Sequence, residues 1–177
     1  MDNEQNTKPG VLTGMFRDKE STERAYNNLR ERGYTDKDIN LIMSNDTRNK
    51  YFKDDDGETE VGTKAMEGAG TGSAIGGTIG AVAGVIAALG TSLIIPGLGI
   101  VLAGPIAAGL AGAGAGGITG GLIGALIGSG IPEERAKVYE SGVKDGGIVM
   151  GVNPRNKEDA EFFENDWRKN KGEEVYS

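Results

Sequence analysis

The chain has 177 residues, 19 basic against 26 acidic side chains, a net charge of −7, and neither histidine nor cysteine. These counts exclude imidazole bases, thiolate nucleophiles, disulfides and the common zinc ligand sets, and the acidic balance disfavours nucleic acid as a partner. We therefore expect a non-enzymatic protein with no catalytic residues, no metal and no cofactor. The length suits one domain with additional elements.

The N-terminal third predicts a βαβ half-domain over residues 11–44, after a disordered lead-in at residues 1–10. A strand is expected at Val11–Phe16 and a second at Ile39–Ser44. Between them Asp18 can cap a helix that runs through Arg32, and Gly33 stands where a left-handed C-terminal cap falls. A right-handed crossover is the default for such a unit.

Residues 45–63 are polar, carry an acidic cluster and show no periodicity, which predicts a linker. Three contiguous acids, Asp54, Asp55 and Asp56, do not match the alternate acids of an EF-hand calcium loop. We interpret this stretch as a solvated acidic loop.

The central part of the chain is chemically different, because 65 consecutive residues from Gly68 to Pro132 carry no charge and include 21 of the 31 glycines. A four-residue spacing places glycines on one ridge of a helix, where another backbone can approach closely. Two runs have this spacing: Gly68, Gly72, Gly76, Gly80 and Gly84, then Gly112, Gly116, Gly120, Gly124 and Gly128. Gly72–Gly77 lacks the spacing of a nucleotide-binding loop.

Segment 64–131 is therefore predicted to be an antiparallel helical hairpin with arms at 67–90 and 105–130. Its turn is expected at Pro96, Gly97 and Gly99, where proline stops a helix. Arms of this length extend roughly 36 to 39 Å, enough to cross the ~30 Å hydrocarbon layer. Packing ridge on ridge would leave an apolar contact face turned partly outward: Ile75, Ile79, Val82, Ile86, Leu89, Ile118, Leu122, Ile123 and Leu126.

Three coverings for that face remain open: membrane lipid, other copies of the chain, or the chain's own domain. Lys64, Arg135 and Lys137 flank the hairpin and favour a membrane-associated protein whose domain stays on the cytoplasmic side. No aromatic residue occurs between Phe52 and Tyr139, so an interfacial aromatic belt is missing. The alternative is a soluble homo-oligomer, such as a ring, cage or filament, in which hairpins bury one another.

The C-terminal part predicts an αβ half-domain over residues 132–152, with a helix from Pro132 to about Lys144 and a strand at Ile148–Val152. The two halves are too small to be stable alone, so they are expected to complete one sheet. Residues 153–177 add an amphipathic helix at Lys157–Lys169, capped by Asn156. Its stripe comprises Ala160, Phe163 and Trp167 and is expected to dock on the domain's own sheet, with a partner or membrane surface as the alternative. The tail after Asn170 is expected to fray.

Three stretches resemble the bacterial general stress proteins of the YflT type. They are Val11–Phe16 with the helix ending in Leu29-Arg30-Glu31-Arg32-Gly33-Tyr34, the central segment with Ile95-Pro96-Gly97-Leu98-Gly99, and Gly130–Glu140 leading to Gly146-Gly147-Ile148. The resemblance implies a stress-induced α+β protein whose small ferredoxin-like sandwich is interrupted by the glycine-rich hairpin. It brings no catalytic residues to this chain.

Overall fold

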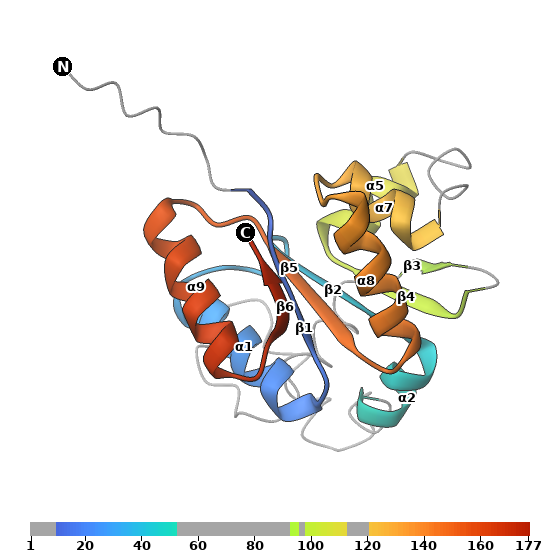
Figure 1. The fold of residues 1–177 in the computed structure, drawn as a ribbon, viewed down its shortest axis with the longest axis horizontal. Coiled ribbons are helices and arrows are strands. Elements are labelled where there is room, and N and C mark those ends of the chain that lie inside the picture. The colour runs from blue at the N-terminus through green and yellow to red at the C-terminus, as the bar shows by residue number, and fades with distance from the viewer. Residues whose placement is uncertain (1–9, 53–92, 96–97, 113–120) are drawn as a thin grey trace, which may run out of the picture.

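A computed structural model describes residues 10–52, 93–95, 98–112 and 121–177. Within them, one sheet is formed by six strands: β1 (Leu12–Phe16), β2 (Ile39–Ser44), β3 (Leu93–Ile95), β4 (Ile100–Ala103), β5 (Ile148–Val152) and β6 (Glu173–Tyr176). The strand order is β3-β4-β2-β5-β1-β6, and each neighbouring pair is antiparallel. The described helices are α1 (Lys19–Glu31), α2 (Asn45–Phe52), α5 (Pro105–Gly112), α7 (Gly121–Gly128), α8 (Glu133–Lys144) and α9 (Lys157–Lys169). The chain therefore has an α+β fold, as the sequence predicts (Figure 1).

Capping side chains set the ends of α1 and α9 as the sequence predicts. Asp18 Oδ1 accepts a hydrogen bond from the Ser21 backbone N–H at 2.7 Å, and Gly33 follows the helix with a φ of +80°. At α9, Asn156 Oδ1 accepts from the Asp159 N–H at 2.7 Å. An N-cap acceptor satisfies a backbone donor that has no partner inside the helix, which is why both helices begin there.

The sheet joins the two ends of the chain. β5 lies between β1 and β2 and is antiparallel to both, so β1 and β2 are parallel without being neighbours. Met150 on β5 stands opposite Gly14 on one side and Leu41 on the other. The expectation that the N-terminal and C-terminal halves complete one sheet is confirmed.

The predicted helical hairpin is wrong at its centre, where the structure has a hairpin of two strands. β3 pairs with β4, and β4 pairs with β2, so this part of the insert extends the main sheet. The expected turn residue Gly99 does lie in a turn, but the turn connects strands. Short apolar runs do not distinguish strand from buried helix by periodicity, and the β-branched Ile94, Ile95 and Ile100 favour strands on either side of the turn.

Two further predictions are corrected. Residues 45–52 form α2 rather than linker, because Ser44 Oγ accepts from the Thr47 N–H at 3.0 Å and Phe52 is buried; residues 53–63 lie outside the described part. The tail expected to fray forms β6, which pairs with β1 and buries Val175. Both elements depend on contacts with residues far away in the sequence.

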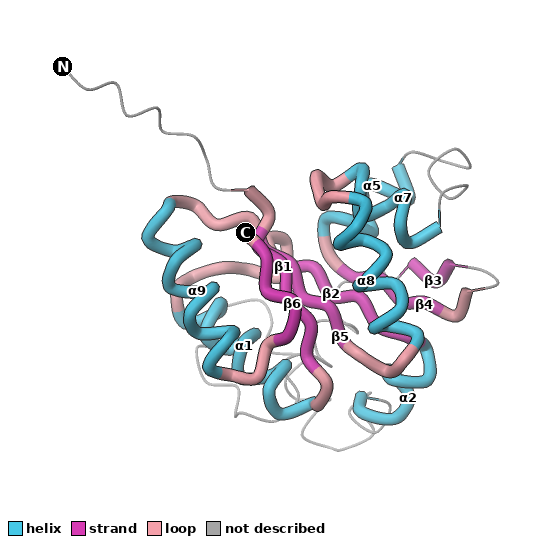
Figure 2. Tube along the Cα trace, in the orientation of Figure 1, coloured by secondary structure: helices cyan, strands magenta, loops and turns pink. Residues whose placement is uncertain are grey.

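The two faces of the sheet carry different helices (Figures 1 and 2). α1 and α9 cover one face, where Leu12, Phe16, Phe163 and Trp167 belong to one buried cluster. α5, α7 and α8 cover the other face, where the buried cluster includes Met15, Leu122 and Tyr139 among others. Alternating residues of β1 supply both clusters, as strand geometry requires.

Candidate interaction surface

The structure describes three of the ten glycines of the predicted zipper, all from its second run. Gly124 and Gly128 belong to α7, and Gly112 is the last residue of α5. The other predicted zipper glycines, Gly68, Gly72, Gly76, Gly80, Gly84, Gly116 and Gly120, lie outside the described residues, as do the turn residues Pro96 and Gly97. The same holds for these predicted contact residues: Ile75, Ile79, Val82, Ile86, Leu89 and Ile118.

The two sides of α7 differ sharply. Leu122 and Leu126 are fully buried, together with Ala125, in the cluster that also contains side chains of α8. On the opposite side of the helix Ile127 is 43% exposed and Gly128 is exposed. The helix therefore turns Leu122 and Leu126 inward and Ile127 and Gly128 outward, and Gly124 is half-buried.

Leu122 and Leu126 correct the expectation that the apolar contact face turns outward. They point into the protein's own core because α7 packs on α8 and the sheet beneath it. Ile123 is partly buried against the same cluster. For this part of the insert, the chain's own domain covers the large apolar side chains.

Within the described part of the chain, little stands beside the glycines of α7. A Cβ atom built on Gly124 or on Gly128 would meet no heavy atom of the described residues within 4 Å, and the same is true at Gly109 on α5. Ala108, beside Gly109, is exposed. We call these five residues the insert surface: Ala108, Gly109, Gly124, Ile127 and Gly128. It is uncharged, and its glycines would allow another backbone to approach closely.

Asn40 fixes the position of α5 under this surface. Its Oδ1 atom accepts a hydrogen bond from the Ile106 N–H at 2.8 Å, although Asn40 itself belongs to β2 and is buried. Pro105 occupies the first position of α5, where a missing backbone N–H does no harm. A side chain of the central sheet thus caps the first helix of the insert surface.

A groove of about 650 Å³ lies at one end of the sheet, between α2, the turn before β4 and the end of α8. Its charged lining is mixed: the cations are Arg17, Lys50 and Lys144, and the carboxylates are Asp46 and Asp145. The α2 amides of Asn45 and Thr47 already donate to Gly99 O and Ser44 Oγ. The groove therefore favours neither an anionic nor a cationic ligand. The sequence gives no sign of it, because distant segments supply its lining.

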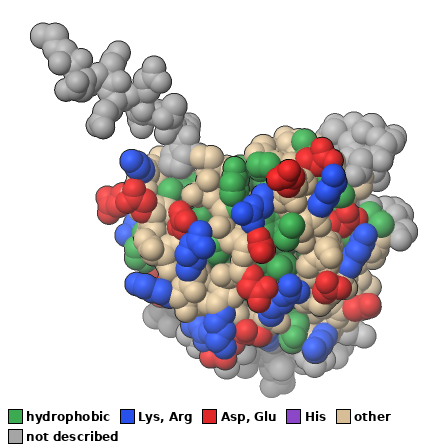
Figure 3. Space-filling model, in the orientation of Figure 1, with side chains coloured by type: hydrophobic (Ala, Val, Ile, Leu, Met, Phe, Trp, Pro, Cys, Tyr) green, Lys and Arg blue, Asp and Glu red, His purple; other side chains and the backbone are tan. Residues whose placement is uncertain are grey.

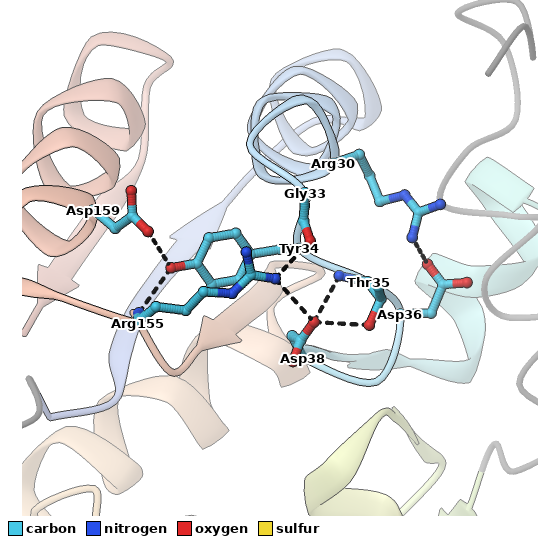
Figure 4. A network of polar contacts seen from close by, with 8 residues as sticks. All are labelled: Arg30, Gly33, Tyr34, Thr35, Asp36, Asp38, Arg155 and Asp159. Carbon is cyan, nitrogen blue, oxygen red and sulfur yellow. Dashed lines mark hydrogen bonds and ion pairs between the residues drawn. The ribbon is translucent and has the colours of Figure 1, made fainter.

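A polar network joins the turn after α1 to the turn before α9 (Figure 4). The Tyr34 hydroxyl donates to Asp159 Oδ2 at 2.7 Å and accepts from the Arg155 N–H at 2.8 Å. The Arg155 guanidinium donates to Gly33 O at 2.6 Å and lies 4.2 Å from the centroid of the Tyr34 ring. The sequence does not reveal this network, because Arg155 and Asp159 lie more than a hundred residues from Tyr34.

The pKa values in this network follow from its contacts. Burial, and then the hydrogen bond to Asp159, raise the pKa of Tyr34 above its usual value of 10.0. The backbone N–H and the hydroxyl of Thr35 both donate to Asp38 and lower the pKa of that carboxyl below 3.8. Tyr34 thus stays protonated and Asp38 charged at neutral pH. The network links α1 to α9, and its polar groups satisfy one another's hydrogen bonds.

Among the described residues, no group of three or more acidic side chains could hold a metal ion. No helix within those same ranges is long and apolar enough to cross a membrane. Acidic and basic side chains are interspersed over the face of the molecule drawn in Figure 3. Comparison with family models, with curated proteins and with solved structures finds no match to this chain.

Proposed function

We propose that the protein is a non-enzymatic assembly protein whose acidic α+β domain presents the glycine-rich insert for self-association. The observation that carries this proposal is the orientation of α7. Its leucines are packed on the chain's own domain, while a Cβ atom built on Gly124 or Gly128 would meet no atom of the described residues within 4 Å. A helix or strand of another copy could approach there more closely than at any larger side chain.

The cost of glycine in a helix supports this proposal. Each glycine in a helix interior is about 1 kcal/mol less favourable than alanine. At Gly109 and Gly124 an alanine methyl group would meet nothing in the described residues, so no contact within that part of the chain requires glycine. Close contact with a second copy would offset the cost.

The finer identity of the fold is part of the proposal. The strand order β2-β5-β1-β6, with α1 and α9 on one face, is the arrangement of a ferredoxin-like βαββαβ sandwich. If β1, β2, β5 and β6 are the four strands of such a sandwich, the segment from α2 to α8 is an insertion between β2 and β5. This organisation agrees with the resemblance to bacterial general stress proteins, so we propose a stress-related role.

Membrane association is the second candidate function. It is favoured by the 65 uncharged residues from Gly68 to Pro132 and by the basic Arg135 and Lys137 that follow them. In this case the insert would bind lipid, and the acidic domain would stay on the cytoplasmic side.

Replacing Gly124 or Gly128 with leucine in the full chain separates the two functions. Light scattering of the wild-type protein without detergent should give a discrete mass above that of one chain. Each leucine variant should raise the dissociation constant at least tenfold, because the added side chain holds the neighbour away. Val138→Leu, at an exposed position of α8, is the matched control and should change nothing.

Two results would count against the proposal that α7 mediates self-assembly. A wild-type protein that stays monomeric at all concentrations and floats with phosphatidylglycerol vesicles supports the membrane candidate instead. An oligomer that tolerates both leucine variants leaves assembly in place but removes the glycines of α7 from its interface.

A further inference from the structure

The two edges of the sheet are protected to different degrees. At the β6 edge the register shifts between Thr13 and Met15, and Glu174 has a φ of +50°. The Arg168 guanidinium also donates to Val175 O at 3.0 Å, which occupies a backbone acceptor of that strand. Irregular pairing and charged side chains are the usual means by which proteins prevent another strand from adding to an edge.

In the described part of the chain, the β3 edge has none of these protections. β3 pairs with β4 through Leu93, Ile94 and Ile95, and no other described strand lies on its far side. Its three residues carry no charge, glycine or proline, and the nearest charged residues along the chain are Glu67 and Glu133. An edge strand of this kind directs unpaired N–H and C=O groups outward and can template a further strand.

We propose that β3 pairs with β3 of a second copy, antiparallel about a two-fold axis, so that one sheet continues across a dimer. This inference rests on the proposed self-assembly function and names its partner and contact. A two-fold contact uses the same surface on both copies, and an uncharged strand can face itself without repulsion. A charged edge could not.

The surroundings of β3 agree with a second copy as the occupant. α5 packs against β3 and β4, and on its exposed side it carries the small residues Ala108 and Gly109. A Cβ on Gly109 would meet no described atom, so no bulky side chain at that position blocks the approach of another chain. With β3 open among the described residues and β6 protected, pairing would end at a dimer, whereas two open edges would give a ribbon.

Single cysteines test the proposal cleanly, because the chain contains none. Leu93→Cys, Ile94→Cys and Ile95→Cys would each be placed in the full chain and oxidised mildly. Two-fold pairing puts one of these residues opposite its own copy, with Cα atoms about 4.5 to 5.5 Å apart, which a disulfide can span. We expect one of the three to give mostly cross-linked dimer, and Glu174→Cys on β6 to give none.

A charge at the edge provides a second test. Ile94→Lys should raise the dimer dissociation constant at least tenfold in sedimentation equilibrium, while Glu174→Lys should not; circular dichroism would verify the fold of both. A dimer that forms no cross-link at any β3 position overturns the β3 contact and leaves the assembly function standing. A chain that is monomeric throughout overturns both.

Discussion

At the scale of single residues, Gly104 shows how little freedom the junction between β4 and α5 has. Its φ is +98°, a conformation that side chains rarely adopt, and an added Cβ would lie 2.2 Å from Ile39 O. The next residue begins α5, and its neighbour Ile106 is held by Asn40. Glycine at position 104 thus allows the chain to pass from β4 into α5 while its backbone lies against β2.

Alanine at this position should be strongly destabilising. We expect Gly104→Ala to lower the free energy of unfolding by about 2 kcal/mol or more, because the methyl group meets backbone and the φ becomes strained. Gly109→Ala is the matched variant five residues later. It should raise the free energy of unfolding of the monomer by about 0.5 to 1 kcal/mol, since alanine favours a helix more than glycine does and its Cβ would meet no described atom. Equal effects in urea unfolding would contradict the assignment of the junction.

At the scale of elements, local capping decides where α1 and α9 begin, and it explains why the sequence predicts both helices well. Asp18 and Asn156 each supply an acceptor within three residues of the donor they satisfy. α2 also has a local cap, Ser44, but its mostly polar sequence shows no apolar stripe. Because α2 buries few residues, chiefly Phe52, its sequence shows no hydrophobic periodicity that would predict a helix.

The cap of α1 makes the free energy of unfolding depend on pH. The Ser21 N–H bond holds the pKa of Asp18 below its usual value of 3.8, so the unfolded chain takes up the proton first as the pH falls. The stabilisation is complete above the unfolded-state pKa and is lost as the pH drops from about 5 through the folded value. Asp18→Asn keeps a capping oxygen without this titration. It should therefore flatten the fall in unfolding free energy between pH 5 and 3, and an unchanged slope would contradict this origin.

At the scale of the whole molecule, β6 closes the fold onto α8. The Tyr139 hydroxyl donates to Glu174 O at 2.6 Å, and Thr13 Oγ1 lies 2.8 Å from the same hydroxyl oxygen. Arg135 of α8 forms an ion pair with Glu174. The last strand therefore connects β1, on the sheet, with a helix of the second face.

Removing residues 171–177 distinguishes this strand from a frayed tail. We expect the unfolding free energy to fall by about 2 to 3 kcal/mol, from lost burial of Val175 and an unsatisfied Tyr139 hydroxyl. Removing Ser177 alone should have little effect. A tail that merely frays would give no difference between the two truncations in thermal or urea unfolding.

The sequence by itself determined the α+β class, the bounds of the capped helices and the strands at Ile39–Ser44 and Ile148–Val152. These depend on signals within a few residues: caps, alternation and a helical stripe. Only the tertiary structure decided that 93–103 forms strands, that the tail forms β6, and that Leu122 and Leu126 face inward. The reason is that an uncharged run rich in glycine and isoleucine suits several environments equally well, and its conformation is selected by the sheet edge and the helix it meets.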